Sequence, residues 1–263
     1  PLIVDTHLDF IKSGADVIVT NNFSSRRKRM KDNNVDKLFN FANEKAGELA
    51  LNAKKISKKN ILIAGSLPAQ NDTYVQDERE RNLIKKGFYE QANLLKPFVD
   101  FFYLDVLSSI KEVEIALNVT ESMNLPVLVG IHVKKDGKLP SGETITEMVK
   151  RCKNNNWLGL ISACVSPEII EKTSDEIERL KIPFGFKVNL WKIEEPLPVH
   201  KFALPDNKIA TNPAETLGSR NDYKDIDFLE FSKMMVKKGA TILGGCCETK
   251  PSHIKAISKL KVF

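Results

Sequence analysis

Short apolar runs alternate with amphipathic segments along almost the whole chain. The runs are rich in Val, Ile, Leu and Phe, and most are followed by a segment in which apolar residues recur at helical spacing. Continuous apolar strands that alternate with helices indicate a parallel sheet with right-handed crossovers. We predict seven strands, which begin at Ala15, Asn60, Asp100, Pro126, Trp157, Ile182 and Ala240.

The chain opens on a predicted helix rather than on a strand. This helix spans residues 2–13, and Gly14 follows it as a C-cap glycine would. A Pro- and Asn-rich irregular stretch is predicted over residues 190–221. Further helices are predicted over residues 35–57, 77–96, 109–123, 144–154, 167–180, 223–238 and 251–260.

Seven strand–helix units headed by a helix fit a (βα)8 TIM barrel whose first strand is absent from this sequence. The length of 263 residues suits one such barrel. The alternative is an open doubly wound sheet, but the Gly-rich phosphate loop that usually follows the first strand of that fold is missing. We therefore expect a single barrel domain over residues 1–263, with no interdomain linker.

The charge pattern bears on the partners of the protein. Lysine and arginine outnumber aspartate and glutamate by 40 to 34, but the two signs are mixed along the chain. The densest basic run, Arg26–Lys31, has no interleaved aromatic residues, so we predict a solvated loop or helix face rather than a nucleic-acid site. No apolar run approaches the roughly 20 residues of a membrane helix. We expect a cytoplasmic protein without nucleic-acid or membrane partners, and the sequence does not exclude an oligomer.

Three of the four cysteines fall at predicted strand ends. Cys164 ends the strand that begins at Trp157, and Cys246 and Cys247 follow the last strand after two glycines. In a parallel barrel the carboxyl ends of the strands form the functional face, so these thiols can converge. Three thiolates bind zinc tetrahedrally and leave one position open, as in a catalytic site. Four cysteines are too few for a disulfide scaffold, which favours a reducing compartment.

Other interpretations of the thiols stay open at this point. A single cysteine at a strand end is often a small buried apolar residue, and Cys152 is expected to be such filler. Adjacent cysteines can form a vicinal disulfide. Cys246 or Cys247 could also act as a covalent nucleophile with His132 or His253 as base. A third hypothesis is a non-catalytic protein that binds zinc or a partner.

The segment Leu243–Ala256, LGGCCETKPSHIKA, closely resembles the Gly-Gly-Cys-Cys segment of the homocysteine S-methyltransferase family, which is related to betaine–homocysteine methyltransferase. His7–Phe23, Gly65–Pro68 and Asp136–Gly142 are similar to further segments of that family, in the same order. The resemblance implies a zinc-dependent (βα)8 barrel enzyme that transfers a methyl group to the thiol of homocysteine and so gives methionine.

The resemblance also implies roles for particular residues. The zinc ligands of the family correspond to Cys164, Cys246 and Cys247, and its substrate-binding positions to Asp105, Asn22 and Asn189. The chain departs from the family pattern at several of these places. Asp105 stands where the family usually has a glutamate that holds the amino group of homocysteine. Asn22 stands where threonine is usual, and Ala163 stands where asparagine is common before the first zinc ligand.

The methyl donor implied by the family is a small molecule with a sulfonium or quaternary ammonium group. S-methylmethionine, S-adenosylmethionine, betaine and dimethylsulfoniopropionate all carry such a methyl group, and the sequence does not rank them. Phe23, Tyr103 and Trp191 could contact a methylated cation through their ring faces, although core packing is the more common role for such residues.

Overall fold

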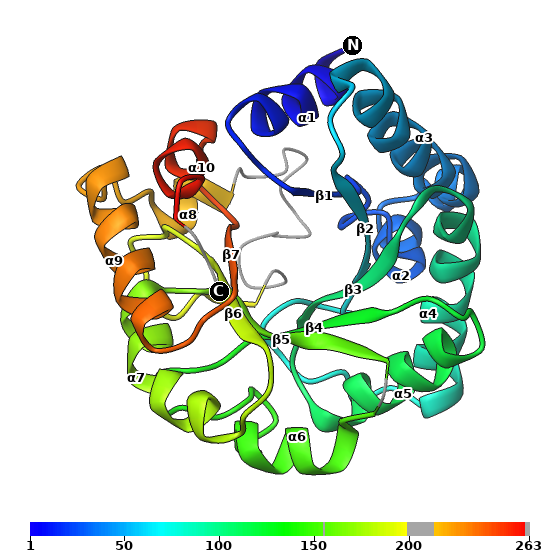
Figure 1. Ribbon diagram of the computed structural model, residues 1–263. Helices are drawn as coiled ribbons and strands as arrows, with labels where there is room; N and C mark the ends of the chain where they lie inside the picture. Colours follow the sequence, from blue (N-terminus) through cyan, green and yellow to red (C-terminus); the bar gives the residue numbers. More distant parts are fainter. Residues whose placement is uncertain (155, 199–212, 261–263) are drawn as a thin grey trace.

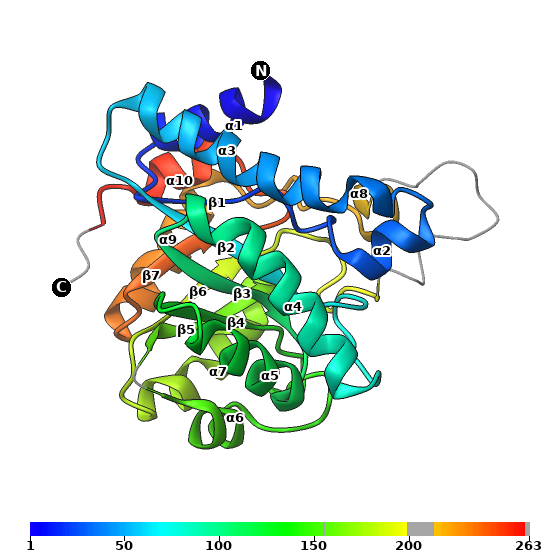
Figure 2. The same cartoon turned by 90° about the vertical axis from the view of Figure 1, so that its right-hand side faces the viewer.

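The computed structural model describes residues 1–154, 156–198 and 213–260. Its seven strands are all parallel and hydrogen-bond in the order in which they occur along the chain. The sheet curls, with the helices outside it (Figures 1 and 2). The strands are β1 (Val17–Val19), β2 (Leu62–Pro68), β3 (Phe101–Leu107), β4 (Val127–Ile131), β5 (Trp157–Val165), β6 (Phe184–Val188) and β7 (Ile242–Gly245).

The predicted helices are present, with ends that differ by a few residues from those expected. Two short helices, α2 and α8, were not predicted. The helices are α1 (Leu2–Lys12), α2 (Arg27–Asp32), α3 (Phe39–Ser57), α4 (Arg81–Leu95), α5 (Ile110–Glu121), α6 (Ile145–Cys152), α7 (Pro167–Arg179), α8 (Pro213–Leu217), α9 (Asp225–Lys237) and α10 (Pro251–Ile257), with 3-10 turns η1 (Asp36–Leu38) and η2 (Lys96–Phe98).

The strand order decides between the two predicted architectures. A doubly wound sheet reverses its strand order at a switch point, whereas this order runs from β1 to β7 without reversal. In the described residues β7 does not pair with β1, so the sheet is open between these two strands. The helices α1 and α10 contact each other across this opening (Figure 1). The structure therefore shows a curled seven-stranded parallel sheet, and the closure of an eight-stranded barrel stays a prediction.

The alternation of side chains along β3 explains how the sheet presents polar groups inward. Tyr103 packs in a cluster inside the curled sheet, whereas Phe102 and Leu104 pack under the outer helices. Asp105 lies two residues beyond Tyr103 and so points inward as well. Every residue of β3 is buried, because helices cover one face and the interior cluster covers the other.

Side-chain caps start the helices that follow β3 and β5. Ser109 accepts a hydrogen bond from the backbone N–H of Glu112 at the start of α5. Ser166 does the same for Ile169 at the start of α7, with Pro167 in the first turn. Such caps satisfy backbone donors that a helix leaves free, so they fix where each strand ends and its helix begins.

The basic run 26–31 does not form the fully solvated face that we expected. Arg26 is only 1% exposed, and its Nη1 donates to the carbonyl of Ala69 at 2.9 Å and to Thr73 Oγ1 at 3.4 Å. Burial lowers the pKa of Arg26 to about 10. The guanidinium supplies several donors to the loop after β2, which is why this charge is buried rather than solvated. The rest of the run forms α2, and Arg27 pairs with Glu90.

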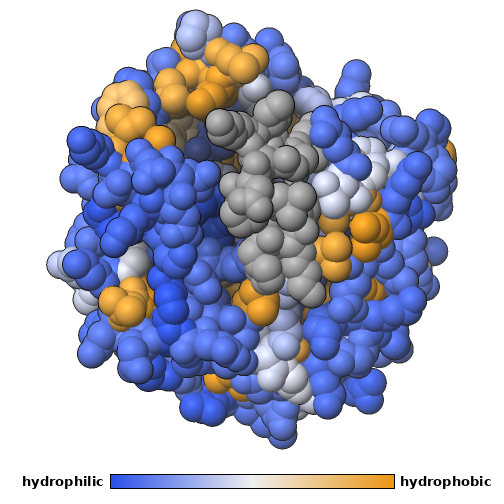
Figure 3. All heavy atoms as spheres, turned by 180° about the vertical axis from the view of Figure 1, so that it is seen from behind, coloured by the Kyte–Doolittle hydropathy of each residue, from blue (hydrophilic) through white to orange (hydrophobic). Residues whose placement is uncertain are grey.

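The outer surface is mostly hydrophilic, and apolar side chains form small separate patches on the face shown in Figure 3. Within the described part of the chain, no helix combines the length and apolar character that crossing a membrane requires.

Candidate metal centre at the carboxyl edge of the sheet

Three cysteine side chains meet where β5 and β7 end. The sulfur of Cys164 lies 3.5 Å from that of Cys247, which lies 3.8 Å from that of Cys246. All three sulfur atoms lie within 4.8 Å of one another. The structure thus brings together the three residues that the sequence singled out, although 82 residues separate Cys164 from Cys246 along the chain (246 minus 164).

A bulge at the end of β5 aims Cys164 at the other two thiols. The register with β6 shifts between Ala163 and Val165, and Cys164 has a left-handed backbone with φ 54°. Consecutive residues of a regular strand point to opposite faces, yet Ala163 and Cys164 both belong to the interior cluster. Such bulges redirect side chains next to functional sites. Asn189 supports the bulge, because its Nδ2 donates to the carbonyl of Cys164 at 2.7 Å.

The segment after β7 is fixed by its backbone. The N–H of Cys246 donates to the carbonyl of Val188 at 2.6 Å, and the carbonyl of Cys247 accepts from Leu190 N at 3.0 Å. Thr249 then turns back, and its hydroxyl donates to the carbonyl of Cys246 at 2.6 Å. A Cβ at Gly245 would collide with the Thr249 side chain, so this tight turn requires glycine.

Tyr74 completes the surroundings of Cys164. Its hydroxyl lies 3.1 Å from the sulfur of Cys164, and its ring packs on that of His132 with 4.6 Å between centroids. Burial, with further help from the thiols, raises the pKa of Tyr74 well above its usual value, so the hydroxyl keeps its proton and can donate to sulfur. Burial lowers the pKa of His132 to about 4, so this ring is neutral near pH 7.

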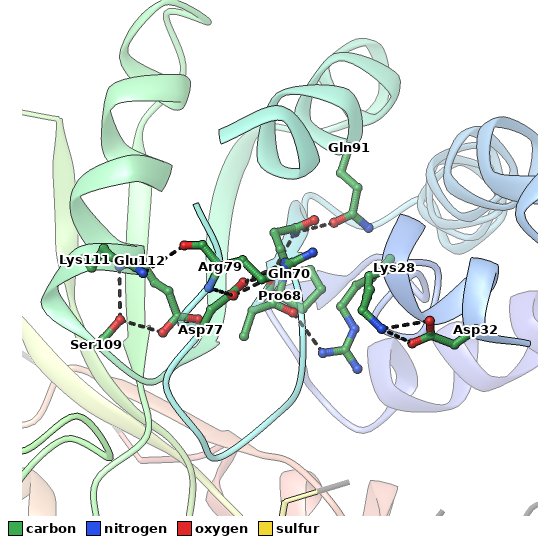
Figure 4. A network of polar contacts seen from close by, with 12 residues as sticks. Lys28, Asp32, Pro68, Gln70, Asp77, Arg79, Gln91, Ser109, Lys111 and Glu112 are labelled. Atoms are coloured by element: carbon green, nitrogen blue, oxygen red, sulfur yellow. Dashed lines mark hydrogen bonds and ion pairs between the residues drawn. The ribbon is translucent and has the colours of Figure 1, made fainter. Parts of the chain in front are cut away.

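Polar contacts hold the loop that carries Tyr74 (Figure 4). Gln70 Nε2 donates to the carbonyl of Pro68 and to Gln91 Oε1, both at 2.8 Å. Farther along the loop, the guanidinium of Arg79 donates to both oxygens of the buried Asp77 carboxylate, with N–O distances from 2.6 to 3.2 Å. Anchors on both sides of Tyr74 place its hydroxyl beside the thiols.

The metal-free thiols share their protons unequally. Donation by Cys164 and Cys247, followed by the charge of Lys187, lowers the pKa of Cys246 well below the usual thiol value. The same contacts raise the pKa of Cys164, chiefly through Cys246, and that of Cys247, chiefly through Cys164. One thiolate therefore forms easily, and the other two thiols resist ionisation until a cation offsets the repulsion.

The donor set fits zinc. Tetrahedral Zn–S bonds of about 2.3 Å place two sulfur atoms about 3.8 Å apart. The separations of 3.5 and 3.8 Å are close to that spacing, and the third pair of sulfur atoms lies within 4.8 Å. Three soft thiolates favour zinc over hard cations, and three protein ligands leave one tetrahedral position for a substrate.

Asp105 is engaged by a residue that the sequence did not single out. Lys187 of β6 places its Nζ 3.1 Å from Asp105 Oδ1, and Ser66 Oγ donates to Asp105 Oδ2 at 2.9 Å. The ammonium also lies 4.8 Å from the centre of the Tyr103 ring. Burial, the largest single effect, would lower the pKa of Lys187, but the negative charges around it, led by that of Asp105, together outweigh burial and raise the pKa well above the usual lysine value. The feature of the sequence that could have pointed to Lys187 is a lysine within an otherwise apolar, buried strand.

The two asparagines predicted to bind substrate make hydrogen bonds within the chain. Asn22 is buried, and its Nδ2 donates to Asn43 Oδ1 and to the carbonyl of Ser66, both at 3.0 Å. Asn189 holds the carbonyl of Cys164, and its Oδ1 accepts from Trp191 N at 3.3 Å. Substrate contact by Asn22 and Asn189 stays a prediction, and these bonds give both residues a supporting place around the site.

The histidines do not join the thiols in the described part of the chain. His253 Nδ1 accepts from the backbone N–H of Lys250 at 2.9 Å, which places this ring at the start of α10. His132 contacts Tyr74 rather than sulfur. His7 is buried in α1, and Cys152 is buried in the core. His200 lies outside the described residues.

Part of the loop after β6 lines a hollow of about 370 Å³. None of the three thiols lines it, but Trp191 does, and the same residue packs against Cys247. Trp191 is therefore part of the wall between the thiols and this hollow. The lining residues are Glu168, Trp191, Lys192, Glu194, Arg220 and Asp222.

The fold and site define a class of α/β proteins in which a curled parallel sheet brings together, at its carboxyl edge, three thiols that could hold a metal ion. The sequence model of the homocysteine S-methyltransferase family matches residues 1–260. The chain belongs to the homocysteine S-methyltransferase family.

Individual relatives are distant but cover the chain. An S-methylmethionine–homocysteine S-methyltransferase of Pongo abelii is 24% identical over 258 residues, which is 96% of this chain and 67% of that protein. Betaine–homocysteine S-methyltransferase 1 of Danio rerio is 23% identical over 96% of this chain and 63% of its own length. The chain thus spans 63 to 67% of the length of these two curated relatives.

A solved structure shows the same fold. The metallated form of the homocysteine methyltransferase MmuM from Escherichia coli superposes with a TM-score of 0.76 at 15% identity, over 98% of this chain and 83% of that one. At this identity the likeness establishes the α/β fold with its curled parallel sheet.

Proposed function

We propose that this protein is a zinc-dependent enzyme that transfers a methyl group from a small cationic donor to the thiol of homocysteine, giving methionine. The observation that carries the proposal is the cluster of three thiols at zinc spacing, at the edge of the sheet where strands of such folds present functional residues. Membership of the family supports the acceptor, and the distance from individual relatives leaves the donor to experiment.

In this proposal Cys164, Cys246 and Cys247 hold the metal. A bound zinc ion would supply positive charge that lowers the pKa of the homocysteine thiol, which loses its proton to solvent. Tyr74 would donate its hydroxyl hydrogen to Cys164 and so stabilise the thiolate form of that ligand. Asn189 would hold Cys164 in this orientation by its hydrogen bond to the backbone carbonyl of Cys164.

The transfer itself needs no general acid or base at the methyl carbon. The homocysteine thiolate forms a new S–C bond as the bond from that carbon to the donor sulfur or nitrogen breaks. The bonding electron pair returns to the donor, whose positive charge disappears. The chain therefore acts by holding the two reactants in line and excluding water, which is the effect of proximity.

Asp105 is the buried carboxylate inside the sheet that we propose as the contact for the ammonium group of homocysteine. It lies on β3, and Ser66 and Lys187 fix its two oxygens. Asn22 and Asn189 border the same region and stay proposed substrate contacts.

We also propose that the curled sheet is part of a (βα)8 barrel and that residues 1–263 form one domain. The unbroken strand order and the ring of helices support this architecture. Four free cysteines suit a reducing compartment, so we propose the cytoplasm.

The competing hypothesis of a cysteine nucleophile requires a histidine beside Cys246 or Cys247. In the described residues His132 packs on Tyr74, and His253 bonds to its own helix start. The geometry therefore favours metal chemistry. A non-catalytic zinc protein is the second alternative, and it predicts zinc without homocysteine binding.

The test combines metal analysis with an activity panel. We expect about one zinc per chain, and homocysteine should become methionine with at least one of S-methylmethionine, S-adenosylmethionine, betaine and dimethylsulfoniopropionate. Cys247→Ala should lose zinc and activity together, because two thiolates hold zinc poorly. Cys152→Ala is the matched control, since this cysteine lies outside the cluster and should keep both. Full activity after chelation would refute the proposal.

A further inference from the structure

The ion pair between Asp105 and Lys187 lies directly beneath the thiols. In the strand register Lys187 pairs with Ala163 of β5 and Gly244 of β7. Cys164 is the next residue after Ala163, so the lysine lies one level below the cluster. The pair therefore lies on the inner face of the sheet, one residue level from the three thiols.

Stability alone does not explain this pair. Replacing a buried ion pair with apolar side chains of similar volume is often neutral or stabilising, because desolvation offsets much of the attraction. The neighbouring interior positions are mostly apolar, as in Phe101, Ile161 and Ala163. A lysine and an aspartate at this level are thus better explained by a ligand than by packing.

The pair changes what Asp105 offers to a substrate. Lys187 neutralises the carboxylate and occupies Oδ1, while Ser66 occupies Oδ2. An incoming ammonium group must share Asp105 with an ammonium that the chain already supplies. The amino group of homocysteine then gains less here than it would from an unpaired carboxylate.

Lys187 has hydrogen-bond donors that could bind a substrate. A lysine ammonium has three N–H donors, and within the described residues Asp105 is the hydrogen-bond partner seen for Nζ. Its side chain as a whole is 18% exposed. A carboxylate on the thiol substrate is the group that such donors bind best.

We propose that Lys187 determines acceptor specificity: it neutralises Asp105 and binds the substrate carboxylate, so that the site accepts mercaptocarboxylates without an α-ammonium group as well as homocysteine. This inference rests on the proposed methyl transfer to a metal-bound thiol, and it extends the acceptors of that reaction to a second chemical class.

The experiment compares homocysteine with 4-mercaptobutanoate, which differs from it only in lacking the amino group. Binding to the zinc-loaded protein is measured by calorimetry, and thiol coordination by the absorption of the cobalt-substituted protein. In the wild type the two dissociation constants should agree within about tenfold, which is less than a charged hydrogen bond usually contributes.

Variants of the pair should move this ratio in opposite directions. Lys187→Met leaves Asp105 unpaired, so the preference for homocysteine should grow by about tenfold or more, while 4-mercaptobutanoate weakens. Asp105→Asn leaves the lysine charge unopposed and should shift the preference toward 4-mercaptobutanoate. The double variant has neither charge and should return to a ratio near that of the wild type. Thermal unfolding without thiol identifies any variant that fails to fold.

The outcomes separate this inference from the proposed function. If both thiols coordinate the metal but the wild type prefers homocysteine by about a hundredfold or more, the inference is overturned and the methyl-transfer proposal stands. The same holds if the folded variants leave the ratio unchanged. If neither thiol binds the metal centre of the wild type, both fail. Methylation of 4-mercaptobutanoate by the active donor would support the inference directly.

Discussion

Replacing Tyr74 with phenylalanine tests whether the surroundings of the thiols are built for a metal. The change removes one hydroxyl, which lies 3.1 Å from the sulfur of Cys164, and leaves the ring on His132 in place. In the metal-free cluster the pKa of Cys164 is raised, so this sulfur keeps its proton. In the metal-bound form Cys164 is a thiolate. The Tyr74 hydroxyl therefore stabilises the bound form more than the free form.

The magnitude follows from this difference. A hydrogen bond to a charged group contributes about 1.5–3 kcal/mol, and loss of such a partner around a metal ligand weakens binding about 10- to 100-fold. Zinc affinity of Tyr74→Phe should fall within that range, which corresponds to about 1.4–2.7 kcal/mol. Competition with a chromophoric chelator measures it directly.

Tyr89→Phe is the matched control for this experiment. It removes the same hydroxyl from a tyrosine on α4 that is 50% exposed, and zinc affinity should not change. An affinity of Tyr74→Phe within about twofold of the wild type would contradict the argument, because the predicted loss is at least about tenfold.

Two further predictions concern protons. Zinc binding should release two protons, because Cys164 and Cys247 hold their protons when metal-free. The affinity for zinc should therefore rise by about two orders of magnitude per pH unit between pH 6 and 8. Calorimetry in buffers of different ionisation enthalpy measures the proton release, and a zinc affinity that does not change with pH would contradict this prediction. Burial raises the pKa of Glu112 from 4.5 to about 7. A folded-state pKa above the unfolded value favours the protonated folded protein, so Glu112 should cost stability as pH rises from about 4.5 to 7, by about 3 kcal/mol in all. Glu112→Gln should remove that component from urea unfolding curves, and an identical pH profile in the two proteins would refute it.

The fold was largely predictable because its elements follow local patterns. Residues 101–107 are buried throughout and apolar apart from Asp105, as a strand covered on both faces requires. The meeting of Cys164 with Cys246 and Cys247 was also within reach, since parallel strands end at one edge of the sheet. The seven strands were counted correctly, whereas closure of the ring depends on a pairing that the described strands do not show.

Features that depend on distant contacts were not predictable. Tyr74 stands in a polar loop, and only the fold brings it to Cys164. Arg26 looked like part of a solvated basic run, but its side chain turns inward to carbonyl and hydroxyl groups of the loop after β2. The left-handed backbone at Cys164 leaves no trace in a single sequence, because the residue there is not glycine.

Lys187 shows the same limit in a charged residue. In the sequence Lys187 is a charged residue within an otherwise apolar strand. Its role depends on its ion pair with Asp105 of β3, which stands 82 positions earlier in the chain (187 minus 105). The sequence indicated Asp105 as a substrate contact, and the structure adds the cation that modifies it. The register across β5, β6 and β7 relates this pair to the thiols.

X-ray absorption at the zinc edge, recorded with and without homocysteine, tests the central claim most directly. Three cysteine ligands predict three sulfur atoms at about 2.3 Å and one lighter ligand in the free enzyme, and four sulfur atoms once homocysteine binds. A zinc shell with fewer than three sulfur atoms would contradict the assignment of Cys164, Cys246 and Cys247 as the metal site. An unchanged shell after saturation with homocysteine would contradict activation of the acceptor thiol by the metal.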